Sequence, residues 1–270
     1  MKKIIYDFGA SEGENIPYYL LKSDLIIAVE ANQKSCEIIK QRFYKEIREK
    51  KLIVENCIVS NQNNKNLEFF LHKTNNLLSQ FPKPNNNLIG NFNKINLESA
   101  DVIYLIQKYG KPFYIKIDLE EYDDIILKRI FDSNILPIYI SAEAINTDVI
   151  NSFLNNKHYN AFKLIEGDSI GFLYRNTKIN VYNKKINYSF HKDSAGPFGN
   201  DLLGNWIKKD NFEKLIKFKM SGWRDIHASL TDNYEDTSNF DKYIKIEKRL
   251  KKKTKLIKRF LRIKSKLNFF

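Results

Sequence analysis

The sequence predicts an α/β fold in which a mostly parallel sheet carries helices on both faces. Short apolar runs that are typical of buried strands alternate with helix-forming segments over residues 3–175. The first of these runs passes directly into a glycine-containing turn. Hydrophobic residues make up 43% of the 270 residues, which is enough for one sizeable core and argues against wholesale disorder.

In the first part of the chain, strands and helices alternate in a simple order. We expect a helix beginning near Asn15, because Ile16 and Pro17 follow in what would be its first turn. Residues 73–96 are loop-like, and a loop of that length in a compact domain is usually functional or disordered. The expected strands are 3–8, 25–30, 52–59 and 67–72, the last of them a candidate hairpin partner, and the expected helices are 15–22 and 33–50.

The same alternation continues through the middle of the chain. A helix starting near Ser99 should end at Gly110, a common helix-terminating residue. Two segments around Gly167 and Asp168 suggest a final hairpin. The expected strands are 113–118, 139–143, 161–166 and 170–175, and the further helices are 121–131 and 147–155.

Composition divides the chain into three regions. Residues 1–175 contain the α/β pattern, and residues 176–239 are less regular, which suggests an appended region that packs on the domain or faces a substrate. The spacing of apolar and basic residues over 240–270 predicts a basic amphipathic helix, with Tyr243 and Leu250 on its apolar side. This last region carries 13 Lys or Arg and two acids, so it holds +11 of the net charge of +13 and leaves +2 for the rest.

This charge distribution bears on the partners. A nearly neutral body makes nucleic acid an unlikely substrate, because nucleic-acid-binding proteins usually present a basic face. The apolar stripe of residues 240–270 favours contact with an anionic membrane surface, whereas nucleic-acid contact and simple solvation remain alternatives. The two cysteines, Cys36 and Cys57, form no metal or disulfide pattern, and no run of 18 uncharged apolar residues exists. We therefore expect a cytoplasmic protein, peripheral on the inner face of the cell membrane.

The most specific motif is Asp7-x-Gly9-x-x-x-Gly13, at the point where the first strand becomes a turn. Glycine permits a sharp turn and close approach of the backbone to a ligand. The dinucleotide pattern fails because Ser11 and Glu14 stand where glycines are needed, and the phosphate-loop pattern fails as well. The turn therefore favours a cationic or neutral nucleoside over a pyrophosphate, and Asp7 is a candidate partner for a ligand's ammonium. An ordinary strand-to-helix turn is the alternative.

Three further carboxylates end predicted strands. Glu30 lies 21 residues after Gly9, a spacing at which an acid often binds ribose hydroxyls in nucleoside-binding α/β folds. Asp118 ends the 113–118 strand and should face Asp7 across the crevice at the carboxyl edge of the sheet. Glu143 ends another strand at the same edge. Four acids follow Asp118, and three of them, Glu121, Asp123 and Asp124, fit a helix N-terminus; the fourth is Glu120.

The segments DFGASEG, VEAN, NCIVS and IKIDLEE resemble the motifs of the FkbM family of methyltransferases over about residues 4–175. The resemblance implies a Rossmann-like class I fold with a mostly parallel seven-stranded sheet, S-adenosyl-L-methionine as cofactor, and usually O-methylation. Its substrates are often sugars of surface polysaccharides. Three residues depart from the family pattern: Ser11 replaces Asn, Ala31 replaces Pro and Glu121 replaces Gly. The cofactor-binding residues expected from the motifs are Asp7, Gly9, Ala10, Ser11, Gly13, Glu30, Ala31, Ser60 and Asp118.

Methyl transfer to a hydroxyl benefits from a base that takes the proton. The candidates are Asp118, Glu143 and His227, with His191 weaker. Asp118 and Glu143 could instead hold a divalent metal, but no motif demands one and none is expected. Two other functions compete with sugar O-methylation: methylation of RNA, and non-catalytic nucleoside binding within an envelope assembly.

Overall fold

The computed structural model describes residues 2–182, 184–217, 223–231 and 256. Apart from Leu256, the basic helix expected over 240–270 lies outside the described residues. Among the residues that are described, no helix has the length and apolar character needed to cross a membrane.

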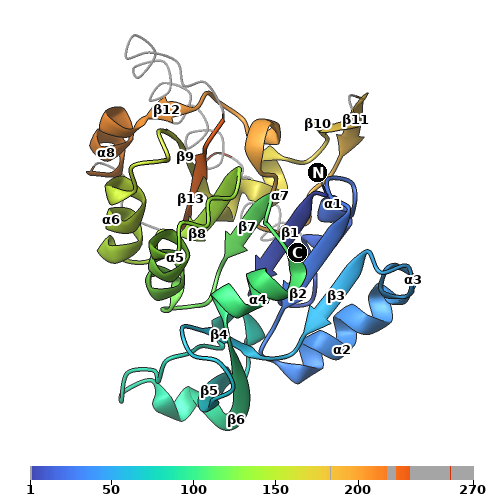
Figure 1. Cartoon of the computed structure of the whole chain (residues 1–270), viewed down its shortest axis with the longest axis vertical. Helices are drawn as coiled ribbons and strands as arrows, with labels where there is room; N and C mark the ends of the chain where they lie inside the picture. Colours follow the sequence, from blue (N-terminus) through green and yellow to red (C-terminus); the bar gives the residue numbers. More distant parts are fainter. Residues whose placement is uncertain (1, 183, 218–222, 232–255, 257–270) are drawn as a thin grey trace, which may run out of the picture.

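An eight-stranded sheet forms the centre of the molecule, in the order β12-β9-β13-β8-β7-β1-β2-β3 (Figure 1). Strands β3, β2, β1, β7 and β8 run parallel to one another, whereas β13 runs antiparallel to both β8 and β9. The strands are β1 (Ile4–Phe8), β2 (Leu25–Val29), β3 (Leu52–Glu55), β7 (Tyr114–Ile117), β8 (Tyr139–Glu143), β9 (Ala161–Glu166), β12 (Ile207–Lys208) and β13 (Arg224–Ser229).

This sheet confirms the predicted fold class. Seven strands remain when the two-residue edge strand β12 is left out. If these seven are numbered along the chain from β1 to β13, their order across the sheet is 6-7-5-4-1-2-3. Only the seventh, β13, is antiparallel to its neighbours. That arrangement is the Rossmann-like class I methyltransferase fold. The order reverses between β1 and β7, and such a reversal places a crevice outside the carboxyl ends of the two strands.

Two hydrophobic layers hold helices against the sheet. Alternate side chains of each strand point to opposite faces, so Tyr6 and Phe8 join one layer while Ile5 joins the other. The first layer is covered by α4 (Val102–Tyr109), α5 (Asp123–Asp132), α6 (Thr147–Asn155) and α8 (Lys209–Lys217). The second is covered by α1 (Ile16–Leu20), α2 (Gln33–Arg42) and α7 (Ile170–Leu173), and α3 (Tyr44–Arg48) follows α2.

Two predicted elements are each divided in the structure. The single helix expected over 33–50 is interrupted at Phe43, whose backbone angles (φ −118°, ψ 33°) are not helical. The strand expected over 52–59 becomes β3 in the central sheet and β4 (Ile58–Ser60) in a separate three-stranded sheet.

The loop and helix expected between residues 73 and 110 are partly wrong. β6 (Phe92–Asp101) occupies the end of that loop and pairs antiparallel with β5 (Asn66–His72), which confirms a hairpin partner for the latter. The helix begins only at Val102, because the Asp101 side chain accepts hydrogen bonds from the amides of Ile103 and Tyr104 and so caps α4. Short 3-10 turns lie between the two strands, at Asn76–Leu78 and Ile89–Asn91.

The hairpin expected around Gly167 is wrong, since residues 170–173 form helix α7. The antiparallel neighbours of β9 are β12 and β13, both from the region 176–239 that was expected to be appended. That region therefore completes the central sheet. It also contains a two-stranded hairpin of β10 (Thr177–Val181) and β11 (Lys184–Tyr188), and 3-10 turns lie at Gly167–Ser169 and Gly199–Asp201.

Candidate active site

A cavity of about 350 Å³ opens at the carboxyl ends of β1, β2, β7 and β8. It lies at the reversal of strand order, where ligands bind in open α/β sheets. Seven of the residues predicted for cofactor binding or catalysis line it: Gly9, Ala10, Ser11, Glu30, Ala31, Asp118 and Glu143.

The glycine turn brings the tips of β1 and β7 into contact. Gly9 has a φ of +81°, and a Cβ placed there would lie 1.8 Å from the carbonyl oxygen of Asp118. Only glycine fits this position without a shift of the backbone. The tips of the two strands therefore meet at Gly9 and Asp118. Gly13 (φ +83°) faces Ile16 and Phe43 instead of the cavity.

Glu30 is held in place by the backbone around it. Its Oε2 accepts a hydrogen bond from the Ser11 amide (2.9 Å), and its Oε1 accepts one from the Asn32 amide (2.8 Å). Burial raises the pKa of Glu30 to about 7, although these two bonds act in the opposite direction. Each carboxylate oxygen has a second lone pair, so Glu30 keeps acceptor capacity for a ligand's hydroxyl groups.

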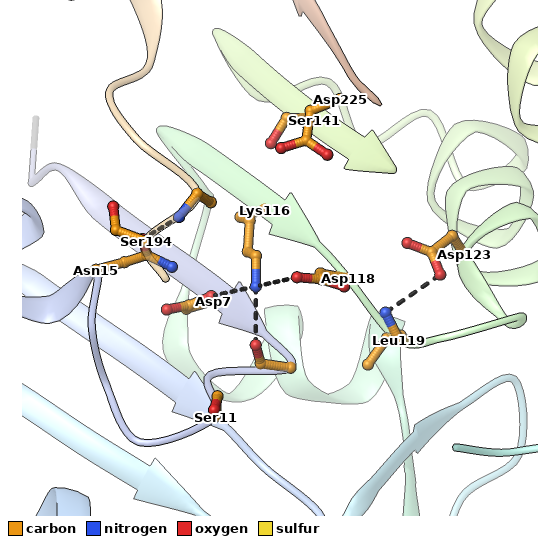
Figure 2. A network of polar contacts seen from close by, with 12 residues as sticks. Asp7, Ser11, Asn15, Lys116, Asp118, Leu119, Asp123, Ser141, Ser194 and Asp225 are labelled. Atoms are coloured by element: carbon orange, nitrogen blue, oxygen red, sulfur yellow. Dashed lines mark hydrogen bonds and ion pairs between the residues drawn. The ribbon is translucent and has the colours of Figure 1, made fainter. Parts of the chain in front are cut away.

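Lys116 is a site residue that the sequence interpretation missed. Its Nζ donates to the Gly9 carbonyl (2.8 Å) and lies 3.0 Å from Asp118 Oδ2 and 3.4 Å from Asp7 Oδ1 (Figure 2). Burial acts to lower the pKa of Lys116, but the two carboxylates outweigh it and hold the pKa above its ordinary value. The available signal was a lysine inside the buried run YIKI, since a buried charge needs a partner.

Asp7 takes a different place from the one expected. It is fully buried and does not line the cavity, and the ammonium group that it meets belongs to Lys116. Burial raises the pKa of Asp7, and Lys116 opposes that effect. Asp7 therefore supports the site from behind through Lys116.

An acidic group stands at the ends of β7 and β8. Carboxylate oxygens of Asp118, Glu120 and Glu143 all lie within 4.8 Å of one another, and the three residues line the cavity. Burial, reinforced by Asp118, raises the pKa of both Glu120 and Glu143 to about 8. Helix α5 begins only at Asp123, and Glu120 lies in a left-handed turn (φ +45°) before it.

Two more buried acids lie behind this group. Asp123 is 1% exposed; its Oδ2 accepts from the Leu119 amide (3.2 Å), whereas its Oδ1 has no hydrogen-bond partner among the described residues. Asp225, on β13, accepts from the Trp223 indole (3.2 Å). Burial, with Asp118 nearby, raises the pKa of Asp123 to about 8 and that of Asp225 to about 7.

Other candidate residues lie away from the cavity. Ser60 hydrogen-bonds through its Oγ to the backbone of Gln62. His227 is buried in the middle of β13, and burial and Lys163 lower its pKa to about 3. His191 is exposed and lies 3.5 Å from Asp193, which itself lines the cavity. The exposed Glu121 does not line the cavity, so its replacement of a glycine leaves the cavity open.

The segment between β5 and β6 forms another wall of the cavity. Leu77 and Leu78, which are 49% and 45% exposed, line it together with Phe81. Phe81 packs edge-on against Tyr122, another lining residue, with ring centroids 4.8 Å apart. This wall combines these apolar side chains with the uncharged Asn76 and Ser79, in contrast to the acidic strand ends.

No family model matches the chain, and no curated protein matches it either. Several solved structures show distant similarity. The precorrin-6y C5,15-methyltransferase of Geobacter metallireducens is 10% identical, with 85% of this chain and 80% of that chain covered and a TM-score of 0.38. An S-adenosylmethionine-dependent O-methyltransferase of Thermotoga maritima is 6% identical (87% and 62% covered, TM-score 0.36).

A putative RNA methyltransferase of Pyrococcus horikoshii is similarly distant, at 12% identity with 87% and 76% covered and a TM-score of 0.35. At these scores the similarity assigns no activity to this chain, and the resemblance to the FkbM family stays a prediction.

Proposed function

We propose that this protein is an S-adenosyl-L-methionine-dependent O-methyltransferase that acts on a sugar hydroxyl of a bacterial surface polysaccharide or its lipid-linked precursor. One observation carries the proposal: the glycine turn, Glu30 and the acidic strand ends open into one cavity at the reversal of strand order. When bound, S-adenosyl-L-methionine supplies a methyl group that its sulfonium activates for transfer.

The residues of the cavity fit this cofactor. Glu30 is fixed by two backbone amides and can still accept hydrogen bonds from a ribose diol. The backbone at Gly9 and Ala10 lines the cavity without a bulky side chain. Among the described residues that line the cavity, Lys116 is the one cation against six carboxylates, so the electrostatics favour a ligand with positive charge.

Proton removal from the acceptor falls to the acidic group in this proposal. In methyl transfer the carbon–sulfur bond of the cofactor would break as the carbon–oxygen bond forms, leaving a neutral thioether, and the acceptor's hydroxyl proton would pass to a carboxylate of Glu143 or Glu120. A pKa of about 8 suits a base that works near neutral pH. His227 is not used, because its ring is buried in β13 and does not line the cavity.

Aromatic residues that line the cavity support a sugar as the acceptor. Sugars present hydroxyl groups at their edges and C–H groups on their faces, and aromatic rings pack against those faces. Trp223, Tyr122 and Phe81 all line the cavity beside carboxylates that can accept bonds from hydroxyls. The exposed Leu77 and Leu78 would contact an apolar part of a lipid-linked precursor.

Calorimetric titration of the full chain with S-adenosyl-L-methionine and with its demethylated product tests the cofactor assignment. Glu30→Ala should weaken binding by about tenfold or more, since it removes a charged hydrogen-bond acceptor from the nucleoside. Glu37→Ala is the matched control, because Glu37 is an exposed acid on the neighbouring helix and does not line the cavity. Equal affinities in the two variants would refute the assignment.

Mass spectrometry of surface glycans from cells with and without the gene tests the acceptor. Loss of the gene should lower the mass of one glycan by one methylene for each missing methyl group. Methyl incorporation into RNA by the purified protein would favour an RNA methyltransferase instead. Cofactor binding with no transfer to either class would favour a non-catalytic nucleoside-binding protein.

A further inference from the structure

We infer that Asp118, Glu120 and Glu143 form a binding site for a divalent cation of the Mg²⁺ and Mn²⁺ class. The site lies in the cavity, but cation binding can be measured without cofactor or acceptor. Its failure is therefore distinguishable from failure of the proposed methyl transfer. A bound ion would keep Glu120 and Glu143 ionised as its ligands, so these residues act as proton acceptors only in the ion-free form.

The geometry of the three carboxylates suits one ion. Their oxygens lie within 4.8 Å of one another. Oxygen ligands lie about 2.0–2.6 Å from Mg²⁺ or Ca²⁺, so two ligands of the same ion are at most about 5 Å apart. A site made only of carboxylate oxygens favours hard cations such as Mg²⁺, Mn²⁺ and Ca²⁺ over zinc or copper.

The turn between β7 and α5 directs Glu120 into this site. Glu120 (φ +45°) and Glu121 (φ +71°) are both left-handed, which separates them from the helix that starts at Asp123. As a result Glu120 lines the cavity while its neighbour Glu121 is exposed. Two adjacent glutamates thus provide one candidate ligand and one matched control.

A buried acid with a free oxygen supplies a second observation. Asp123 is 1% exposed, and its Oδ1 has no hydrogen-bond partner in the described part of the chain. Figure 2 shows one Asp123 oxygen at the Leu119 amide and the other turned toward the side where Asp118 and Asp225 lie. An unpaired buried carboxylate is costly unless positive charge lies nearby. A cation held by Asp118 and Glu120 would supply that charge.

The charges inside the protein do not balance this cluster. Lys116 contacts Asp118 through Oδ2 alone and also serves Asp7 and the Gly9 carbonyl. Arg224, on β13, pairs with Glu166. Within the described ranges, no ion pair involves any of the four remaining acids: Glu120, Asp123, Glu143 and Asp225. An external cation would balance these acids when they are ionised.

Titration of the full chain with Mn²⁺, followed by water-proton relaxation and by electron paramagnetic resonance of free Mn²⁺, tests the inference. We expect one saturable site in the wild type. Glu120→Gln and Glu143→Gln should each weaken binding by about tenfold or more. Glu121→Gln, which removes the same charge one residue away, should bind Mn²⁺ as the wild type does, and so should Glu30→Ala.

Thermal unfolding with and without Mn²⁺ provides a second measurement in case a variant folds poorly. Mn²⁺ should raise the Tm of the wild type and of Glu121→Gln but not that of Glu120→Gln, because a ligand stabilises only the state that binds it. Failure of the wild type to saturate by about 1 mM Mn²⁺ would overturn the site. Equal affinity in Glu120→Gln and Glu121→Gln would overturn it as well.

Discussion

Glu121 shows how a single backbone angle explains a departure from a sequence motif. The family that the chain resembles has glycine at this position, and here Glu121 has a φ of +71°. A side chain in the left-handed region costs free energy because its Cβ approaches the following carbonyl. The turn is therefore retained without the glycine that usually permits it, at the expense of local strain.

Replacement of Glu121 by glycine should stabilise the protein. Relief of the left-handed strain should add about 1 kcal/mol to the free energy of unfolding, reduced somewhat by the greater freedom of glycine in the unfolded chain. Urea unfolding measures the change. Glu121→Ala serves as the control, because it removes the charge and keeps the strain; a gain in that variant as large as in Glu121→Gly would contradict the explanation.

Glu30 makes cofactor binding depend on pH. Burial raises its pKa to about 7, so the carboxyl is largely protonated at pH 6 and largely charged at pH 8. The charged carboxylate is the stronger hydrogen-bond acceptor and attracts a cationic ligand. The affinity for S-adenosyl-L-methionine should therefore rise as the pH increases through about 7. Below the pKa of Glu30, the rise should be at most about tenfold per pH unit. Calorimetry from pH 5.5 to about 8.5 tests this. The Glu30→Gln variant should bind S-adenosyl-L-methionine weakly, and its affinity should no longer rise with pH through about 7. If the affinity of the variant changes with pH as that of the wild type does, groups other than Glu30 cause the pH dependence.

At the scale of residues, the sequence predicts which cavity residues follow the end of a strand, but not which residues a turn directs into the cavity. Gly9, Glu30 and Asp118 were found because each follows a buried strand, and strand ends meet at one edge of the sheet. Glu120 was missed because its left-handed turn has no local signal in LEE. Ser60 was expected in the cavity, which its neighbours Ile58 and Val59 do line, but the Ser60 hydroxyl hydrogen-bonds to the backbone of Gln62 instead.

At the scale of elements, the contact between the tips of β1 and β7 should limit which residue can occupy position 9. Gly9→Ala would place a Cβ 1.8 Å from the Asp118 carbonyl, at a φ that disfavours alanine. We expect the free energy of unfolding to fall by about 1–3 kcal/mol, because backbone must move to relieve the clash. Gly90→Ala is the control, since a Cβ there meets nothing within 4 Å. Similar urea midpoints for the two variants would show that the tips separate easily.

The elements also differ in how well the sequence predicts them. β1, β2 and β7 are apolar apart from Asp7 and Lys116, because both faces of a central parallel strand are covered. β13 was missed because its six buried residues, RDIHAS, include three with ionisable side chains. Arg224 is compensated by Glu166, a residue 58 positions earlier in the chain, and such a partner becomes visible only when the sheet is assembled.

At the scale of the whole molecule, positive charge is concentrated at one end of the chain. Residues 240–270 contain 13 Lys or Arg and two acids, whereas the remaining residues carry a net charge of only +2. A cavity rich in carboxylates therefore belongs to a nearly neutral body joined to a strongly basic segment. This separation suggests that the segment serves attachment and leaves the chemistry of the cavity to the body.

We predict that residues 240–270 attach the protein to anionic lipid. Each basic residue near such a surface contributes about 1 kcal/mol, and the apolar stripe predicted for the segment would enter the headgroup region. In a sedimentation assay the full chain should bind phosphatidylglycerol vesicles and release them as salt rises, since ions screen charges beyond about 8 Å at physiological ionic strength. A chain ending at residue 239 should stay in solution while keeping its affinity for S-adenosyl-L-methionine. Equal binding to phosphatidylcholine vesicles would show that charge is not the cause, and vesicle binding by the shortened chain would place the contact on the body instead.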